Sequence, residues 1–473
     1  MRNHKRVKNS LKSVIYMLLA LCFAATAFSG CKTRGNNESG SDVQTDTNLA
    51  FSGETVTILS QTYLDPREDD EAKSQTTYQK QVEYIKKIEN DLNCKIKVIV
   101  QSDYGKLNET FVNAVASGIK AADILSVSGN LIYPAYPVNE WVVPLNRSVG
   151  INYSVFDKDY TQATAINGDV YAVTPLRSRM PQNVVFVNKT LFETFGLSNK
   201  YNLTSLVADK HWNWEKLKEI AAEAKADSPQ IYDGNTPGQV LINSILVSNG
   251  CFYVNKSPVT NEVTLDIQND TAVDALNFAS SMLKSGLVGK SDLNWDTGKT
   301  AFADGKTLFY IGSLSSAGVF KQGIIKENFT VLPIPIGQAS ADYINDISDC
   351  VVFSVPSWVE KTKHAALFSV VEAMCKEQGY EGVAHQAITM LSDQQSLNNI
   401  MMMAEKTVYT TYKSYDLLVA KFVWSDFSMI SGGSFNNYIN QHASAVQEYI
   451  NKLWTVIPKG EEISAATENS SSG

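Results

Sequence analysis

Residues 94–127 read CKIKVIVQSDYGKLNETFVNAVASGIKAADILSV, and this stretch decides the fold. Cys94–Val100 and Ala122–Val127 are short, apolar and rich in β-branched residues, which indicates two strands. Between them, Leu107–Gly118 has apolar residues at helical spacing and ends on glycine, which is typical of a helix terminus. The segment therefore predicts a strand, a helix and a second strand that lie parallel in one sheet.

The same alternation extends in both directions. Upstream, Glu54–Ser60 predicts a strand, and Tyr78–Asn93 predicts a helix through its apolar residues at helical spacing. Downstream, we expect strands at Val184–Val187, Thr307–Gly312 and Cys350–Val355. Helices are expected at three further places and near the C-terminal end: Trp214–Ala226, Thr271–Ser285, His364–Gln378 and much of the last 50 residues before the tail. Asn213 is the expected N-cap of the first of these helices. The chain is thus predicted to be α/β, with parallel strands and right-handed crossovers.

Ligands of such sheets bind beyond the carboxyl ends of the strands. This rule predicts a site near Gln61–Tyr63, Gln101–Tyr104 and Ser126–Tyr133. The candidate ligand residues among them are Tyr63, Asp103, Ser128, Gly129 and Tyr133. Two alternatives stay open: Tyr63 can instead cap its own lobe, and Asp103 can be a solvated turn residue.

The N-terminal residues predict an export signal. Five basic residues occur within MRNHKRVKNSLK, and an apolar run from Val14 to Phe28 follows. The run is shorter than the roughly 20 residues that span a bilayer. Ser29-Gly30-Cys31 resembles the lipobox of bacterial lipoproteins, which implies cleavage before Cys31 and lipid on its sulfur. An uncleaved signal anchor is the alternative.

Polar segments flank the expected globular part, about residues 54–457. We expect a signal peptide at 1–30, a lipidated N-terminus with a flexible tether at 31–53, and a disordered tail at 458–473. The length of 473 residues suggests two or three domains, and hydrophobic residues, at 44%, are enough to build sizeable cores. The formal net charge of −8 becomes −13 once the five basic residues of the signal are removed, which argues against a nucleic-acid partner.

The chain shows little sign of catalysis or metal binding. Its histidines are isolated, and no HExxH, GxSxG, GxGxxG or Walker pattern occurs. No metal or cofactor is therefore expected. Cys94, Cys251, Cys350 and Cys375 have irregular spacing, which favours buried thiols, with one disulfide as the alternative.

Six further segments, in order along the chain, resemble the family 1 extracellular solute-binding proteins, the sugar-type binding lipoproteins of ATP-binding-cassette (ABC) importers. The segment containing Phe111–Gly118 and Ala122–Leu125 is similar to the family's "ASG…PDI", with Ala122 in place of proline. The other five are Tyr136–Asn146, Gly168–Pro175, Val185–Leu197, Trp212–Leu217 and Ala301–Leu308. The resemblance covers about 400 residues.

The resemblance implies a periplasmic-binding-protein-like type II fold, with two discontinuous lobes and a central ligand cleft. By this analogy, one lobe comprises 54–165 plus 310–360 and the other 166–309 plus 361–457. The implied function is capture of a carbohydrate, most simply an oligosaccharide, and its delivery to ABC permease subunits by a monomer that is anchored to the cell membrane through lipid. The alternatives are a peptide or other polar solute, and a surface polysaccharide hydrolase or lyase.

Aromatic and charged residues complete the candidate site. Trp424 lies in a late segment where sugar-binding relatives place a stacking tryptophan, and Trp295 lies in a polar loop. Arg177 follows the Thr174-Pro175 strand, where its fork can grip hydroxyls or a uronate carboxylate. The alternatives are a core aromatic for Trp424 and a surface ion pair for Arg177. Two departures from the family stand out: Gly312-Ser313-Leu314 lacks a common tryptophan, and Asp346 and Asp349 replace glycine-rich sequence.

Overall fold

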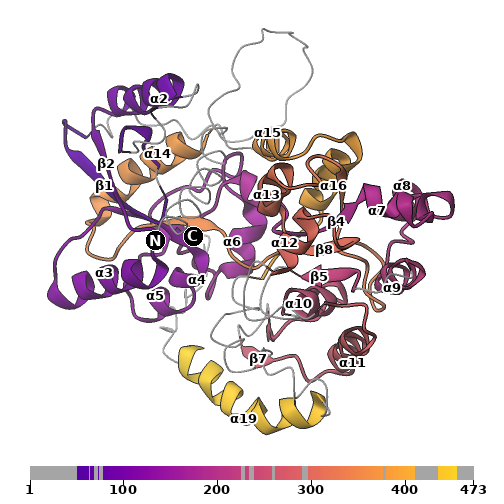
Figure 1. The fold of residues 1–473 in the computed structure, drawn as a ribbon. Helices are drawn as coiled ribbons and strands as arrows, with labels where there is room; N and C mark the ends of the chain where they lie inside the picture. Colours follow the sequence, from indigo (N-terminus) through magenta and orange to yellow (C-terminus); the bar gives the residue numbers. More distant parts are fainter. Residues whose placement is uncertain are drawn as a thin grey trace, which may run out of the picture.

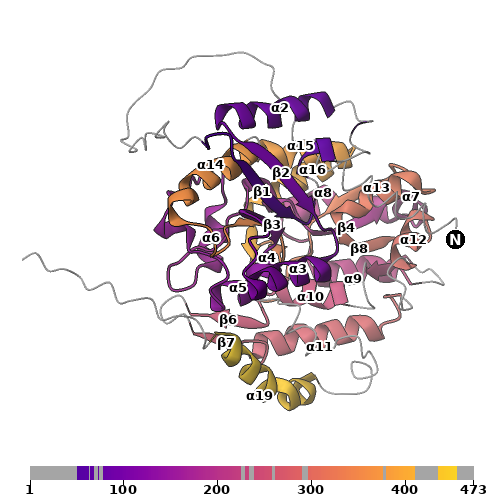
Figure 2. The same cartoon turned by 90° about the vertical axis from the view of Figure 1, so that its left-hand side faces the viewer.

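The computed structural model describes residues 51–62, 64–68, 73, 78–224, 229–233, 239–257, 262–289, 297–376, 380–410 and 435–454. Figure 1 shows two α/β lobes side by side, and each is built around its own four-stranded sheet. In Figure 2, the view from the side of the first lobe, its strands β1, β2 and β3 lie in front.

The sheet of the first lobe has the predicted parallel core. β1 (Thr55–Ser60) lies between β2 (Lys95–Val100) and β3 (Ile124–Ser128) and pairs with both in parallel. The connecting helices are α2 (Tyr78–Asp91) and α3 (Tyr104–Ser117). β11 (Val351–Ser354) adds an antiparallel strand on the outer side of β3.

Alternating side chains of this sheet build two apolar layers. Val56, Ile58 and Val98 pack with α2 and with α14 (His364–Cys375) on one face. Leu59, Leu125 and Val127 pack on the other face with α3 and the short helices α4 (Gly129–Ile132) and α5 (Ala135–Val138). This two-faced burial is complete at β3, whose five residues are all buried, whereas β2 at the sheet edge alternates between buried and exposed residues.

The sheet of the second lobe is mixed. β4 (Asn183–Asn188) pairs antiparallel with β8 (Phe309–Ser313) and β9 (Phe329–Leu332), and β5 (Ile231–Asp233) pairs parallel with β8. One face packs against α7 (Lys189–Thr194), α8 (Leu203–Ala208), α9 (Trp214–Glu223), α10 (Gln239–Ser248) and α11 (Asp270–Lys284). The other packs against α12 (Thr297–Ala303), α13 (Ala317–Gln322), α15 (Tyr380–Met390) and α16 (Gln394–Glu405).

Two smaller features complete the second lobe. β6 (Val254–Lys256) and β7 (Val263–Leu265) form an antiparallel hairpin. The C-terminal helix α19 (Phe435–Trp454) packs on β7 and α11 and also contacts α5 of the first lobe, so it joins both lobes at the lower edge of Figure 1.

The division between lobes differs from the expected boundaries at three places. Ile166–Val173, expected in the second lobe, packs in the cores of the first. β8 and β9, expected in the first lobe as part of 310–360, are strands of the second sheet. α14, expected in the second lobe as part of 361–457, packs in the first. Strand and helix patterns locate these elements but do not reveal which sheet they join.

Within the described ranges, the chain passes between the lobes more than once. It leaves the first lobe through 174–182, returns through 345–350, and leaves again between α14 and α15. β10 (Asn345–Ile347) and β12 (Thr407–Tyr409) pair in parallel at this junction, beside α6 (Lys158–Thr164). We call the passages 174–182 and 345–350, together with residues 407–410 that pair with the second of them, the crossing segments.

Candidate functional site

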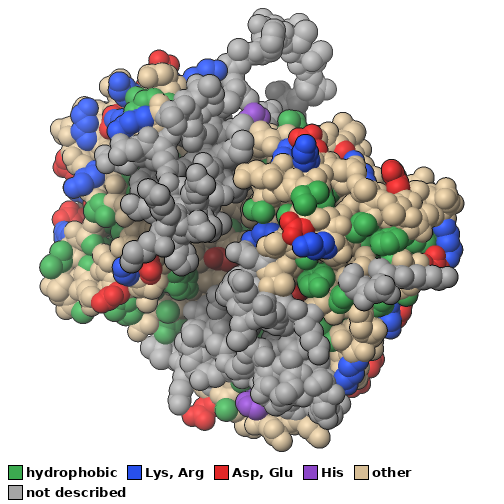
Figure 3. Space-filling view, in the orientation of Figure 1, with side chains coloured by type: hydrophobic (Ala, Val, Ile, Leu, Met, Phe, Trp, Pro, Cys, Tyr) green, Lys and Arg blue, Asp and Glu red, His purple; other side chains and the backbone are tan. Residues whose placement is uncertain are grey.

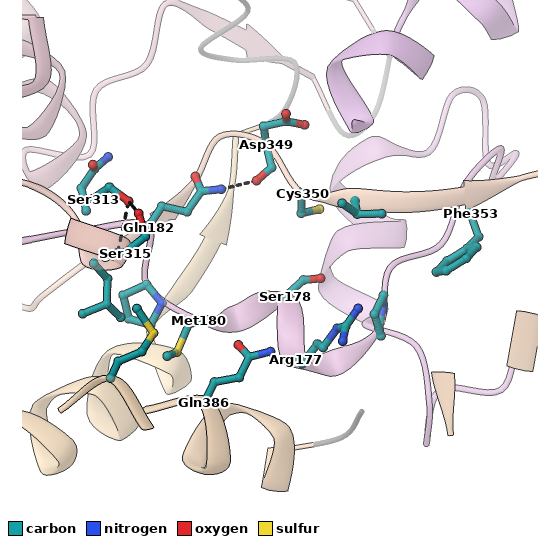
Figure 4. Close-up of a pocket in the computed structure, with 16 residues that line it drawn as sticks. Arg177, Ser178, Met180, Gln182, Ser313, Ser315, Asp349, Cys350, Phe353 and Gln386 are labelled. Carbon is teal, nitrogen blue, oxygen red and sulfur yellow. Dashed lines mark hydrogen bonds between the residues drawn. The ribbon is translucent and has the colours of Figure 1, made fainter. Parts of the chain in front are cut away.

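A cavity of about 570 Å³ lies between the crossing segments 174–182 and 345–350. Its walls come from four elements that are distant in sequence: Pro175–Asn183, Ser313–Ser315 after β8, Asp349–Phe353 leading into β11, and Gln386 and Met390 of α15 (Figure 4). First-lobe and second-lobe residues therefore face the same space. The size falls within the roughly 300–1,000 Å³ of small-molecule sites.

The wall that carries Arg177 is a short 3₁₀ helix, η5 (Leu176–Arg179). Pro175 precedes it, and the Ser178 amide donates to the Pro175 carbonyl at 2.9 Å. Thr174 Oγ1 donates to the Val351 carbonyl at 2.8 Å and lies 2.6 Å from Ser178 Oγ. These bonds fix η5 against β11.

Gln182 links two crossing segments at the cavity wall. Its Oε1 accepts from the Ser348 amide at 3.1 Å and from Ser348 Oγ at 3.3 Å, and its Nε2 donates to the Asp349 carbonyl. Its own carbonyl accepts from the Leu314 amide at 2.9 Å. One side chain thus ties the entry of β4 to the segment that returns to the first lobe.

The predicted residues at the end of β3 bond the segment that lines the cavity. Ser128 Oγ donates to Asp349 Oδ2 at 2.7 Å, and the Gly129 amide donates to the Cys350 carbonyl at 2.9 Å. The Asn130 amide also donates to Asp349 Oδ1, at 3.3 Å. Ser128 and Gly129 therefore hold the lining segment in place and are not themselves among the lining residues.

Asp157 forms the polar centre of the junction. This N-cap of α6 is fully buried and accepts from both the Nε and an Nη of Arg179, the latter at 2.8 Å, and from Tyr409 Oη at 2.8 Å. Burial opposes the charge of Arg179, but the hydrogen bonds and charge of Asp157 outweigh it and raise the arginine's pKa. Asn345 Nδ2 bonds both the Arg179 carbonyl, at 2.9 Å, and Thr407 Oγ1, at 2.7 Å.

Two other predicted site residues have structural roles. Asp103 is the exposed N-cap of α3 and accepts from the Lys106 amide at 2.9 Å. Tyr133 is 1% exposed, and its Oη accepts from the amides of Tyr171, at 3.3 Å, and Ala172, at 3.1 Å. Burial raises the pKa of Tyr133 to about 12. Neither residue lines the cavity.

Arg177 is the predicted site residue that does line the cavity. Tyr63, Trp295, Trp424 and Cys31 lie outside the described residues. Sequence reasoning missed Gln182, Gln386 and Met390, for which no local motif exists. It did single out Ser313 and Asp349, but as departures from the family pattern.

The lining combines amide and hydroxyl groups with apolar surfaces. Gln182, Asn183, Gln386 and three serines supply donors and acceptors, while Met180, Leu314 and Phe353 supply apolar contact. No lining serine or cysteine is hydrogen-bonded to a histidine among the residues that the structure describes. Burial raises the pKa of the Cys350 thiol, which keeps it protonated. The arrangement suits reversible binding of a small polar molecule.

Three structural observations concern the whole described part of the chain. Cys94, Cys251, Cys350 and Cys375 are all thiols, as the preferred interpretation of their spacing predicted. Within the ranges given above, no group of three or more His, Cys, Asp or Glu is placed to hold a metal ion. No helix in those ranges has both the length and the apolarity needed to cross a membrane.

Comparison with known proteins gives a family match and many structural matches. The model of the family described as "Bacterial extracellular solute-binding protein" matches residues 69–356. No curated protein sequence matches the chain.

Three of the similar solved structures have names that give their solutes. The cyclic alpha-maltosyl-1,6-maltose binding protein of Arthrobacter globiformis has a TM-score of 0.62 at 13% identity, covering 84% of this chain and 99% of its own. The GacH receptor of Streptomyces glaucescens, solved unliganded and with acarbose, has a TM-score of 0.57 at 16% identity, covering 85% and 99%. UgpB of Mycobacterium tuberculosis, solved with glycerophosphocholine, has a TM-score of 0.56 at 14% identity, covering 85% and 98%. These likenesses establish the two-lobed fold predicted from the sequence.

Proposed function

We propose, from the premise that this chain belongs to the bacterial extracellular solute-binding protein family, that it captures an oligosaccharide and delivers it to an ABC importer. The observation that carries the proposal is the cavity between the lobes, which combines amide and hydroxyl groups with apolar surface. A sugar presents hydroxyl groups around a ring with apolar C–H faces, so it matches both parts of this lining. Matched hydroxyls discriminate well because an unmatched buried polar group costs about 1–3 kcal/mol.

A thermal-shift screen of neutral and acidic glycans, with peptides and glycerophosphodiesters beside them, tests this proposal. A ligand at 100 times its Kd stabilises the folded protein by about 2.7 kcal/mol, which raises the unfolding midpoint measurably. We expect a glycan to do so. If only peptides raise the unfolding midpoint, the ligand is a peptide and not a sugar.

A second candidate ligand class is a different polar solute. The structural match to UgpB, solved with glycerophosphocholine, favours keeping this class in the screen, since that solute is not an oligosaccharide. The cavity lining alone does not separate the two classes, because amides and hydroxyls also bind glycerol and phosphodiester groups. A midpoint that rises with a glycerophosphodiester but with no glycan would select this alternative.

The stacking surface is proposed to come from Trp424 and Trp295. Phe353 is the one aromatic residue among the lining residues that the structure describes, and sugar rings bind well on flat aromatic faces. Trp424→Ala and Trp295→Ala should each weaken binding of the selected glycan in calorimetry. An unchanged affinity together with a lower unfolding midpoint would instead make the residue part of a core.

We further propose that the mature protein is a lipid-anchored monomer on the outer face of the cell membrane. The support is the basic and apolar N-terminal segment followed by Ser29-Gly30-Cys31. Mass spectrometry of the mature N-terminus should find a lipid-modified Cys31, and Cys31→Ala should release the protein from membranes. A polysaccharide hydrolase or lyase is tested by incubation with glycans, where steady release of new reducing ends would contradict a purely binding role.

A further inference from the structure

Two arginines of η5 are directed to different surroundings. Arg179 is 14% exposed and is bonded to Asp157 and Asp159 in the junction. Arg177, two positions earlier, is half-buried and lines the cavity. A turn of 3₁₀ helix places side chains at this spacing on different sides. The Arg179 guanidinium therefore lies in the junction and the Arg177 guanidinium lies at the cavity.

The acidic group of the cavity is committed to the first lobe. Asp349 is the one carboxylate among the lining residues that the structure describes. Its Oδ2 accepts from Ser128 Oγ and its Oδ1 from the Asn130 amide. Figure 4 places Arg177 next to Gln386, on the opposite side of the view from Asp349. The two charges therefore belong to different walls.

The packing of α15 leaves room for Arg177. A Cβ built on Gly382 would lie 3.3 Å from the Cβ of Arg177, closer than most such contacts. A Cβ at position 382 would need α15 or η5 to give by a few tenths of an ångström. Since Gln386 lies one helical turn further along α15, glycine at 382 lets the arginine and this amide share one wall.

We propose that the captured sugar carries an anionic oxygen group, either a carboxylate or a phosphate, and that Arg177 binds it. The planar guanidinium matches two oxygens of either group with two parallel hydrogen bonds. Recognition has to be local, because the mature chain carries a net negative charge that does not steer anions toward it. This inference rests on the proposed sugar-binding function and names the ligand class of the same cavity.

Calorimetry with matched pairs of probes tests it on the delipidated protein. Trigalacturonate is compared with its methyl ester, an aldouronic xylo-oligosaccharide with xylotriose, and glucose 6-phosphate with glucose. We expect the charged member of a pair to bind at least about 10-fold more tightly, the strength of one charge-assisted interaction. The advantage should shrink as salt is raised. The uronate and phosphate arms separate the two anion sources.

Variants assign the effect to Arg177. Arg177→Gln should abolish the preference for the charged member, and Arg177→Lys should retain part of it because the charge remains without the fork. Gly382→Val should reduce it by displacing the arginine. Lys86→Gln, which removes one positive charge from the exposed face of α2, should leave it unchanged.

Two results would overturn the inference. One is equal affinity for both members of every pair, with Arg177→Gln affecting both alike. The other is a neutral glycan from the wider screen that binds while no charged probe does. Either result leaves sugar capture intact, whereas the absence of any glycan response defeats the proposed function itself.

Discussion

Gln182 lines the cavity and also bonds the crossing segment 345–350. It accepts from Ser348, donates to the Asp349 carbonyl, and lines the cavity. Gln182→Ala leaves these partly buried partners without their bonds, which should cost about 1–3 kcal/mol in urea unfolding. It should also weaken glycan affinity, because the wall formed by Asp349 loses its tie to β4.

Gln182→Glu gives a sharper comparison. The carboxylate can still accept from Ser348 but cannot donate to the Asp349 carbonyl, so it should recover only part of the stability. Gln322→Ala, on the exposed end of α13, serves as the control and should change neither quantity. A Gln182→Ala protein with full stability would mean that the two crossing segments are held together by other contacts.

Tyr133 tests whether a residue predicted to face ligand is structural. Its hydroxyl accepts two backbone N–H groups of the segment that leads into the first crossing. Tyr133→Phe should therefore lower the free energy of unfolding by about 1–3 kcal/mol while leaving glycan affinity unchanged well below the unfolding midpoint. Tyr104→Phe, at a side chain that is 45% exposed, is the matched control. If a stably folded Tyr133→Phe protein lost affinity for the glycan, Tyr133 would be a ligand-binding residue after all.

At the scale of elements, the sequence predicted the first sheet well and the junction poorly. The strand–helix–strand units of 54–127 are encoded by local periodicity, and β1 to β3 formed as expected. The capping signal at Asn213 and the glycine after α3 were also local, and both were confirmed. β8 was located correctly but placed in the wrong lobe, because its pairing with β4 depends on residues more than a hundred positions away.

The candidate site shows the same limit. Arg177 was predicted because it follows a recognisable strand, whereas Gln182 gains its role from Ser348, 166 positions later. Gln386 reaches the cavity only because α15 packs on η5, and no pattern within α15 announces this. The carboxyl-end rule located the right edge of the first sheet, but Ser128 and Gly129 act there through Asp349 and Cys350 rather than as lining residues.

The loop before β10 is held by an acid-sensitive cluster. Lys406, which directly precedes β12, has its Nζ 2.8 Å from Asp342 Oδ2. Lys210 Nζ lies 3.1 Å from the same oxygen. The hydrogen bond from Lys406 is the main cause that lowers the pKa of Asp342 from 3.8 to about 2, against a smaller opposing effect of burial. Below pH 4 the unfolded chain takes up a proton that the folded protein resists, so this stabilisation is present above pH 4 and is lost as the pH falls toward 2.

Thermal unfolding measured between pH 2 and 7 checks this contribution. Asp342→Asn should flatten the acid limb of the curve, and 0.5 M salt should reduce the difference because the pair is partly exposed and worth only about 0.2–1 kcal/mol. Glu193→Gln, an exposed carboxylate on α7, should leave the curve unchanged. A variant curve parallel to that of the wild type down to pH 2 would contradict the assignment.

Helix α19 should stabilise the second lobe through one apolar face. Ile439, Val446 and Ile450 are each 1% exposed, and Gln447 Oε1 accepts from the Leu265 amide of β7 at 2.8 Å. Ile450→Ala should lower the free energy of unfolding by about 2–5 kcal/mol, as expected for a large buried aliphatic side chain. Ser444→Ala on the exposed face should cost little. Equal effects of the two variants would show that the helix contributes through its mere presence rather than through this face.

At the scale of the whole molecule, the crossing segments should move while the sheets stay rigid. The central strands of each sheet are buried on both faces, whereas the junction is held mainly by side-chain hydrogen bonds around Asp157, Gln182 and Asn345. Hinge closure absorbs its changes in a few residues between rigid bodies. Binding of the selected glycan should therefore reduce the radius of gyration in solution scattering and slow amide exchange in 174–182, 345–350 and 407–410, with little change in β1 and β4.

Arg179→Met, which leaves the buried Asp157 without its cation, should lower stability and reduce the ligand-induced compaction. The neutral control is Lys189→Met at the start of α7, outside the junction. Uniform slowing of exchange across both sheets, with no compaction, would mean that the ligand stiffens a cleft that is already closed.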